Sequence, residues 1–266
     1  MRYPTGHTHI YGILGDPIAH VRAPEFLNPM MEAAGLDGFV VPFHVLPADI
    51  GSFVPDLVRL RNLRGFIVTI PHKPAMARLC QRLERAAALT GTANTVRIEP
   101  DGTLTGDMFD GLGLVEGARA HDMDPRGRSV LVLGCGGAGR AIAFAMPDAG
   151  ARSLTLWNRS AQAAHDLRDD IARAFPGFDV RVGEASAQGQ DLVVQCTSLG
   201  LHAEDPLPMD PSSFGPDSRL FDIIAVRDTE LMAASAARGA RVVGGRPMVE
   251  HQAAAQFAFL GPPPLT

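Results

Sequence analysis

The segment Ser129 to Met146 constrains the fold more than any other part of the chain. It reads SVLVLGCGGAGRAIAFAM, a short apolar run, then a turn with spaced glycines, then a longer run of small and apolar residues. A short apolar run bounded by glycine is typical of a buried strand, and the longer run that follows is typical of a helix. The segment therefore predicts a strand, a tight turn and a helix, the repeating unit of a parallel α/β sheet.

The second half of the chain continues this pattern. Four more apolar runs follow, SLTLWNRS, DLVVQCTSLGL, RLFDIIAV and ARVVGG, separated by helical or proline-rich segments. Five strands of this kind predict a doubly wound parallel sheet of the Rossmann type. We expect this domain to span residues 106–245.

The first half predicts a second α/β domain, residues 1–105, with residues 246–266 forming a C-terminal helix that returns to it. We expect strands at residues 10–14, in FVVPFHVL and in GFIVTI, the last an interior parallel strand. Helices are expected at residues 24–34, at 48–62 and, as one amphipathic helix, from Met76 to Gly91. NTVRIEPDGTLTGD predicts a hairpin with Asp-Gly at its turn.

Composition narrows the class of function. Hydrophobic residues make up 46% of the 266 residues and the net charge is -5, so the chain predicts a globular protein without a basic surface for nucleic acid or anionic lipid. Its three cysteines form no CxxC pair, and no histidine spacing suggests a metal site. We find no signal peptide or membrane span, and expect a cytoplasmic monomer or homodimer that binds small molecules.

Gly134, Gly136 and Gly139 satisfy the pattern GxGxxG directly after a predicted strand. In this context the glycines allow a tight turn and let backbone N–H groups approach a pyrophosphate, so the segment predicts a dinucleotide site, with a purely structural glycine turn as the alternative. The next strand ends in WNRS, which offers Arg159 and Ser160 and no carboxylate for a ribose 2′-hydroxyl. We therefore predict that the chain binds NADP rather than NAD. The alternative is that Arg159 is only a solvated charge on a loop and does not contact the cofactor.

Two segments of the first half carry candidate catalytic groups. GFIVTIPHK places Lys73 after an apolar strand, at the edge where parallel sheets bind ligands, although an ordinary surface lysine is the alternative. TGDMFDGLG contains Asp107 and Asp110, of which one could face a cleft while the other caps a helix. A lysine beside a carboxylate would form a proton relay.

Several motifs together resemble the shikimate dehydrogenase family over essentially the whole chain. GDPIAHVRAPEFLN resembles its GxPIxHSxSPxxHN, IVTIPHK its NVTxPxK, GTANTV its GAxNTV and GDMFDGLG its GxNTDGxG. The likeness continues through GCGGAGRA, NRS, CTSLGL and MVEHQAAAQF. The resemblance implies reversible hydride transfer between NADP and a ring hydroxyl or ketone of a shikimate-like or quinate-like compound, as in aromatic amino acid biosynthesis.

The resemblance also implies roles for single residues. Lys73 and Asp110 match the catalytic pair, and Thr69, Asn94 and Gln252 match positions that bind ring hydroxyls. The cofactor-binding residues expected along the matching motifs are Gly134, Gly136, Gly137, Ala138, Gly139, Asn158, Arg159, Ser160, Thr197, Ser198, Gly245 and Met248. His20 matches a family histidine, whereas His72 and His251 only neighbour predicted site residues.

The chain departs from the family where the substrate carboxylate is held. Val21 and Ala23 replace two serines, and Ala225 replaces a tyrosine. An asparagine has become Ile67, and an Asn-Thr pair has become Met108-Phe109. Losing several hydrogen bonds to an anion, each worth roughly 1.5–3 kcal/mol, predicts that shikimate itself binds poorly.

Three alternatives stay open at this point. Arg22 or Arg227 could bind an acid in another way, or both could be ordinary surface arginines. The substrate could be an unrelated alicyclic alcohol. The chain could also be a non-catalytic NADP-binding sensor, although the presence of both Lys73 and Asp110 counts against that reading.

Overall fold

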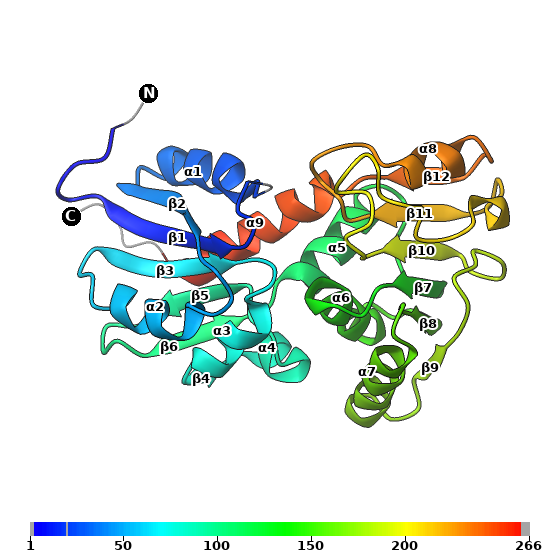
Figure 1. Cartoon of the computed structure of the whole chain (residues 1–266), viewed down its shortest axis with the longest axis horizontal. Helices are drawn as coiled ribbons and strands as arrows, with labels where there is room; N and C mark the ends of the chain where they lie inside the picture. The colour runs from blue at the N-terminus through cyan, green and yellow to red at the C-terminus, as the bar shows by residue number, and fades with distance from the viewer. Residues whose placement is uncertain (1–2, 20, 262–266) are drawn as a thin grey trace. The chain divides into compact units, whose positions relative to one another are not determined.

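A computed structural model describes residues 3–19 and 21–261 of the chain. The chain divides into two compact units (Figure 1). Unit 1 comprises Met1–Phe109 and Gln252–Thr266, and unit 2 comprises Asp110–His251. The sequence predicts the boundaries between a substrate domain and a cofactor domain after residue 105 and before residue 246, and these functional boundaries stay predictions.

Unit 1 contains a mixed sheet of six strands in the order β2-β1-β3-β5-β6-β4. The strands are β1 His9–Gly15, β2 Gly38–His44, β3 Leu63–Val68, β4 Arg82–Leu83, β5 Thr95–Ile98 and β6 Leu104–Asp107. The helices are α1 Ala23–Ala33, α2 Ile50–Leu57, α3 Lys73–Leu79 and α4 Arg85–Thr90. β1 pairs in parallel with β2 and β3, so these three strands end at the same edge.

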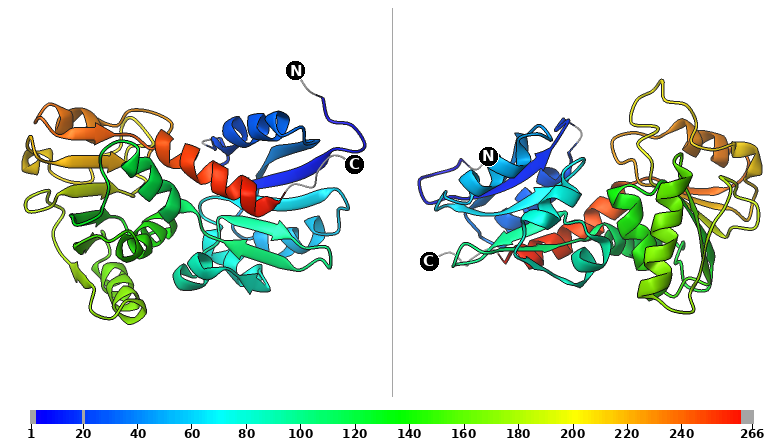
Figure 2. Two further views of the ribbon diagram at one scale, coloured as in Figure 1. Left: turned by 180° about the vertical axis from the view of Figure 1, so that it is seen from behind. Right: turned by 60° about the horizontal axis from the view of Figure 1, so that its bottom comes forward.

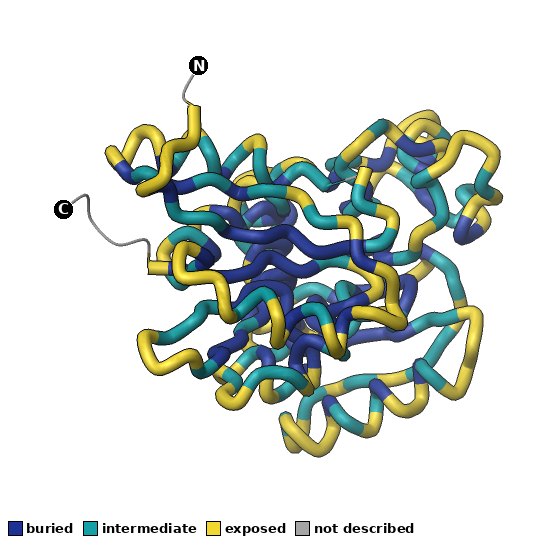
Figure 3. The backbone as a smooth tube through the Cα atoms, turned by 60° about the vertical axis from the view of Figure 1, so that its left-hand side comes forward, coloured by how far each residue is buried: buried dark blue, intermediate teal, exposed yellow. Residues whose placement is uncertain are grey.

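Apolar side chains on one face of this sheet form a core with two helices. α1 contributes Leu27 and Met31, and the C-terminal helix α9 (Arg246–Leu260) contributes Ala253 and Leu260. Figures 1 and 2 show α2 and α3 on the opposite face. The inner strands β1 and β3 are accordingly buried along most of their length (Figure 3).

Three expectations for unit 1 need correction, and the hairpin is confirmed. β3 lies inside the sheet, but it is parallel only to β1 and runs antiparallel to β5. β5 and β6 form the antiparallel hairpin expected from the Asp-Gly turn. The helix expected at 48–62 is the shorter α2, and the single helix expected from Met76 to Gly91 is wrong, because α3 and α4 are separated by β4.

The interruption of that helix has a tertiary cause. Arg82 and Leu83 pair in parallel with β6, and Gln81 adds a backbone bond to Leu104 and accepts one from it through its side chain. The segment thus satisfies the free edge of β6, which outweighs a helix propensity of only tenths of a kcal/mol per residue. Gly91, with φ +64°, ends α4 as a left-handed cap at the predicted position.

Unit 2 contains the predicted doubly wound sheet, entirely parallel, in the order β12-β11-β10-β7-β8-β9. Its strands are β7 Ser129–Leu133, β8 Ser153–Trp157, β9 Asp179–Val182, β10 Leu192–Gln195, β11 Arg219–Asp222 and β12 Arg241–Val243. Its helices are α5 Asp110–Arg119, α6 Gly137–Asp148, α7 Ala161–Ala174, α8 Glu230–Ala236 and a short 3₁₀ helix, Pro211–Ser213. The sixth strand, β9, was not expected, because as a half-exposed edge strand, DVRV, it lacks an apolar run.

The C-terminal helix returns to unit 1 as predicted. α9 begins at Arg246, and from Gln252 onward its residues belong to unit 1. Leu260 lies in the unit 1 core, and Arg97 donates a hydrogen bond to the carbonyl oxygen of Phe259 at 2.8 Å. Across residues 3–19 and 21–261, the structure has no helix with the length and hydropathy that a membrane crossing needs.

Candidate functional site

Lys73 lies in unit 1, at the edge where β1, β2 and β3 end. It opens α3 rather than ending the strand, and only 7% of its surface is exposed. Its carbonyl oxygen accepts a hydrogen bond from the backbone N–H of Ala93 at 3.0 Å. The neighbouring imidazole of His72 is also buried, and its Nε2 bonds to the carbonyl oxygen of Val45 at 2.7 Å. Lys73 is therefore a buried lysine and not the surface lysine of the alternative reading.

Asn94 connects the segment beside Lys73 to two other parts of unit 1. Its Oδ1 accepts hydrogen bonds from the Thr95 hydroxyl at 3.0 Å and from the Phe109 N–H at 3.1 Å. Its Nδ2 lies 3.5 Å from Oε1 of Gln252 in α9. The structure thus brings Asn94 and Gln252 together and links Asn94 through Ala93 to Lys73.

The two aspartates of TGDMFDGLG have different surroundings. Asp107 accepts a hydrogen bond from the backbone N–H of Ala87, in the first turn of α4, at 3.2 Å. Burial raises the pKa of the Asp107 carboxyl. Asp110 is the first residue of α5 in unit 2 and is 2% exposed. Asp107 is therefore the helix cap of the two, which leaves Asp110 as the candidate for chemistry.

The apolar replacements in unit 1 are part of the hydrophobic core. Ala23 and Ile67 belong to the same cluster as Ala253 of α9, and Val21 packs against it. Two further replacements, Met108 and Phe109, are also buried, and the ring centroid of Phe109 lies 5.5 Å from that of Phe259. Arg22 forms an ion pair with Glu25 at 2.6 Å.

The glycine loop of unit 2 has a geometry that needs glycine at Gly134 and Gly139 and leaves open space at Gly136. Gly134 follows β7 with φ +96°, a conformation that L-residues with a side chain rarely adopt. A Cβ at Gly139 would overlap the carbonyl oxygen of Gly134, so the third glycine lets α6 approach the turn. At Gly136, the N-cap of α6, a Cβ would meet nothing within 4 Å. Gly137 and Ala138 form the first turn of the helix, leaving its backbone N–H groups for an anion.

The segment after β8 adjoins this loop. Oδ1 of Asn158 accepts a hydrogen bond from the N–H of Cys135 at 3.0 Å, and its Nδ2 donates to the carbonyl oxygen of Ser160 at 3.1 Å. Arg159 and Ser160 are exposed, and the Ser160 hydroxyl makes no capping bond at the start of α7. Among the described residues Arg159 has no carboxylate partner, so both side chains are available to a ligand.

Gln195 shapes the loop after β10, a role that the sequence did not indicate. Its side chain is fully buried and accepts a hydrogen bond from the Thr197 N–H at 2.6 Å, while its amide donates to the carbonyl oxygen of Leu199 at 2.9 Å. The backbone of Thr197 lies 3.0 Å from the Cβ position of Gly134, whereas Ser198 is exposed. The structure therefore brings Thr197 against the glycine loop.

Asp222 fixes the loop after β11 through hydrogen bonds to its carboxylate. The carboxylate is fully buried and accepts hydrogen bonds from the Ile224 N–H at 3.0 Å and the Thr229 hydroxyl at 2.7 Å. Burial raises its pKa to about 6. The Gly245 N–H donates to the Ile224 carbonyl oxygen at 3.0 Å. This network holds the loop that carries the half-buried Ala225. Met248, three residues after Gly245, is buried in the first turn of α9.

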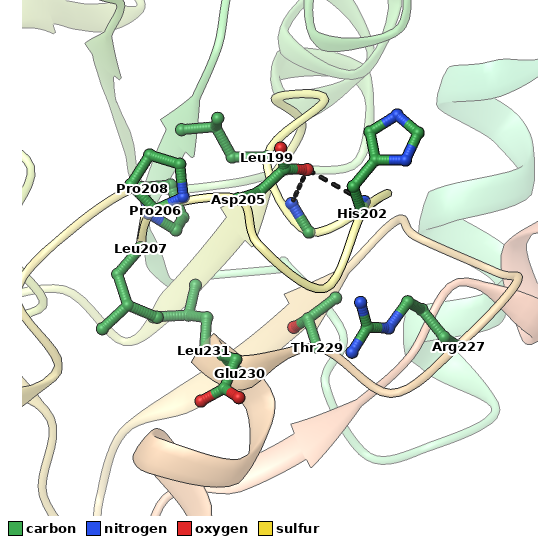
Figure 4. Close-up of a pocket in the computed structure, with 11 residues that line it drawn as sticks. Leu199, His202, Asp205, Pro206, Leu207, Pro208, Arg227, Thr229, Glu230 and Leu231 are labelled. Carbon is green, nitrogen blue, oxygen red and sulfur yellow. Dashed lines mark hydrogen bonds between the residues drawn. The ribbon is translucent and has the colours of Figure 1, made fainter.

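The loops after β10 and β11 also form a small pocket (Figure 4). Arg227 and His202 lie at its rim, and Asp205 accepts hydrogen bonds from the N–H groups of Gly200 and His202, both at 2.9 Å. These bonds are the main reason that the pKa of the Asp205 carboxyl is lowered. Arg227 is half-buried, and the structure gives it no carboxylate within ion-pair distance in residues 3–19 and 21–261.

The remaining histidines and acids give no metal centre. No group of three or more His, Cys, Asp or Glu side chains within the described residues could hold a metal ion. His251 is exposed, and His20 lies outside the described residues.

Comparisons with known proteins fit this geometry. Residues 13–96 match the family described as the shikimate dehydrogenase substrate binding domain. The chain is 38% identical over 255 residues to shikimate dehydrogenase (NADP(+)) of Acidiphilium cryptum, covering 96% of this chain and 91% of that protein. The chain belongs to the shikimate dehydrogenase family.

Solved structures of the shikimate dehydrogenase family have the same fold. The enzyme from Aquifex aeolicus superposes with a TM-score of 0.88 at 28% identity, covering 99% of this chain and 96% of that one. The Thermus thermophilus enzyme in complex with NADP(H) and shikimate has a TM-score of 0.85 at 28% identity, with 97% and 96% covered. The α/β architecture expected from the sequence is thereby confirmed.

Proposed function

We propose that this member of the shikimate dehydrogenase family is an NADP-dependent oxidoreductase that interconverts a ring hydroxyl and a ketone in a shikimate-like or quinate-like alicyclic compound. The observations that carry the proposal are the burial of Lys73, whose backbone carbonyl oxygen is bonded to the N–H of Ala93, and the contact between the amides of Gln252 and of Asn94, the residue that follows Ala93. A cation with neutral hydrogen-bonding groups beside it suits a carbonyl oxygen flanked by hydroxyls.

The residues of unit 2 fit NADP. The cradle of Gly134, Gly136 and Gly139 leaves backbone N–H groups at an open face of α6, where a pyrophosphate binds. Arg159 and Ser160 are exposed and uncommitted, which suits the 2′-phosphate of NADP. We assign the remaining cofactor contacts to Gly137, Ala138, Asn158, Thr197, Ser198, Gly245 and Met248. When bound, the nicotinamide supplies or accepts the hydride.

On the substrate side, we assign the proton transfer to Lys73. Its ammonium gives a proton to the oxygen of the carbonyl that is being reduced and takes it back in the other direction. Asp110 holds the charge and orientation of the ammonium, as the family pattern implies. Thr69, Asn94 and Gln252 bind neighbouring hydroxyls and fix the ring.

A kinetic panel tests this function. Purified protein is mixed with cyclic hydroxy acids and alcohols, with NADP and separately with NAD, and the absorbance of reduced cofactor is followed. We expect turnover with NADP for at least one alicyclic alcohol and its loss in Lys73→Ala. Tight NADP binding without turnover of any compound would instead support the sensor, and turnover only of alcohols unlike shikimate would support the unrelated dehydrogenase.

We also propose that the protein works in the cytoplasm as a monomer or homodimer, which its composition and lack of paired cysteines support. Light scattering coupled to gel filtration measures the oligomeric state. A larger assembly would contradict this part of the proposal.

A further inference from the structure

Two charged side chains on the substrate-facing edge of unit 1, Asp16 and Arg22, already have partners. This edge consists of the segments after β1 and β3, residues 16–25 and 69–73. Asp16 bonds to His44 at 2.7 Å, and Arg22 pairs with Glu25 at 2.6 Å. Among the described residues of these segments, the other cation is the buried Lys73, to which we have assigned the proton transfer.

The side chains between these charges are apolar. Ala23 and Ile67 belong to one core cluster, and Ile18 and Val21 pack against it. We call these four residues the apolar wall. The wall begins beside Thr69, because Ile18 Cδ1 and Thr69 Cγ2 both lie against the Cβ position of Gly15. A group of the substrate that reaches past Thr69 therefore meets methyl groups.

Apart from Lys73, the hydrogen-bonding groups that we find open to a ligand on this edge and on the adjoining helix α9 are uncharged. The Thr69 hydroxyl and the amide nitrogen of Gln252 have no hydrogen-bond partner within the described residues. Hydroxyl and amide groups pair well with substrate hydroxyls, whereas a carboxylate taken out of water needs a cation or several donors. The edge is suited to a polyol and provides no such partner for an acid.

From this inventory we infer that the substrate is uncharged: a polyhydroxylated alicyclic alcohol or ketone without a carboxylate, whose ring C–H surface packs on the apolar wall. The inference rests on the proposed function, since it names the substrate class of that same site. It accounts for both the apolar wall and the paired charges beside it.

The test uses pairs of compounds that differ in charge and hardly in shape. Shikimate is compared with its carboxamide, and quinate with its carboxamide, by calorimetric binding to protein saturated with NADP and by kcat/KM. We expect each amide to bind at least tenfold more tightly than its acid, about 1.4 kcal/mol. Tighter binding of the acids would overturn the inference and leave the proposed function intact, and loss of that preference in Arg227→Ala would then identify the anion site. Failure of all four compounds to bind or react would overturn the inference, while the kinetic panel described above decides the proposed function separately.

A cation placed on the wall provides the second arm. Val21 is half-buried, so Val21→Lys can direct an ammonium toward the edge, and Val21→Gln serves as the uncharged control. We expect the lysine variant to shift the ratio of acid to amide affinity at least tenfold toward the acid and the glutamine variant to leave it unchanged. A folded lysine variant, checked by thermal melting, with the wild-type ratio would show that the wall does not face the substrate and would overturn the inference.

Discussion

The edge of unit 1 around Lys73 and the glycine loop of unit 2, the two proposed ligand sites, differ in the groups that they offer. The loop of unit 2 presents backbone N–H groups, whose position depends on the conformations of Gly134, Gly136 and Gly139. The edge of unit 1 presents side chains, from Lys73, Asn94 and Gln252. A single substitution can remove a side-chain contact, whereas only a substitution to proline removes a backbone donor. Specificity in unit 1 can therefore change while the loop of unit 2 keeps its pattern.

The apolar replacements follow this division. Val21, Ala23 and Ile67 lie in the core of unit 1, where a methyl group in place of a polar one also adds apolar burial. Such replacements add to the stability of the fold, and under the proposed function they also alter the contacts offered to the substrate. In the glycine loop, a side chain at Gly139 would instead disrupt the local backbone.

The largest effect should come from the unit 1 lysine. Lys73→Ala should lower kcat by about two to four decades, the usual contribution of a placed acid or base, and leave NADP binding in unit 2 nearly unchanged. Asp110→Asn should give a similar loss, because the charge that orients the ammonium is removed. Single-turnover kinetics measure the chemical step and NADP titration measures cofactor binding, so a loss of one can be told from a loss of the other. Near-normal turnover of Lys73→Ala on a confirmed substrate would contradict the assignment of proton transfer to unit 1.

The unfolding free energy should depend on pH through Asp222, the side chain that supports the loop after β11, whereas the backbone N–H groups of the glycine loop do not titrate. Burial raises the pKa of Asp222 to about 6, from 3.8 in the unfolded chain. The folded state therefore holds a proton that the unfolded state has lost, and this stabilisation disappears as the pH rises from about 4 to about 6. The group contributes about 2–3 kcal/mol to the fall in unfolding free energy over this range.

Asp222→Asn should remove that contribution. Urea unfolding at pH 4 and pH 7 measures it as the difference between wild type and variant, because other titrating groups cancel. An identical pH dependence in both proteins would show that Asp222 does not titrate in this window.

The cradle itself can be tested with two glycines. Gly139→Ala should destabilise the unliganded protein by roughly 1–3 kcal/mol, because its Cβ would overlap the Gly134 carbonyl oxygen. Gly136→Ala should leave unliganded stability within about 0.5 kcal/mol, since its φ of -71° suits alanine and the space is open. It should nevertheless weaken NADP binding about tenfold or more, because that open face is where the phosphates approach. Denaturant melts and NADP titration measure both, and equal affinity of Gly136→Ala and wild type would place the cofactor elsewhere.

The smallest effect concerns the choice of cofactor. Arg159→Ala should erase most of a preference for NADP over NAD of about 1–2 kcal/mol, the contribution of one charged hydrogen-bonding partner. The preference is modest because Ala163, in the first turn of α7, adds no second cation. Arg181→Ala, on the exposed edge strand β9, is the matched control. Calorimetric dissociation constants that are equal for NADP and NAD in the wild type would refute the assignment.

The sequence by itself determined the features whose residues are contiguous. The strand, glycine turn and helix at Ser129 to Met146 lie as predicted, because each step depends on neighbours along the chain. The β5–β6 hairpin and the cap at Gly91 are correct for the same reason.

Tertiary structure decided the features that join distant segments. Gln81 to Leu83 leave a favourable helix to pair with β6, and Lys73 opens α3 instead of ending β3. Asn94 reaches Gln252 in α9, and Gln195 and Asp222 become loop supports only because burial leaves backbone N–H groups as their partners. Contacts of this kind are not visible in local sequence, because their free energy comes from groups that only the folded chain brings within hydrogen-bonding distance and out of water.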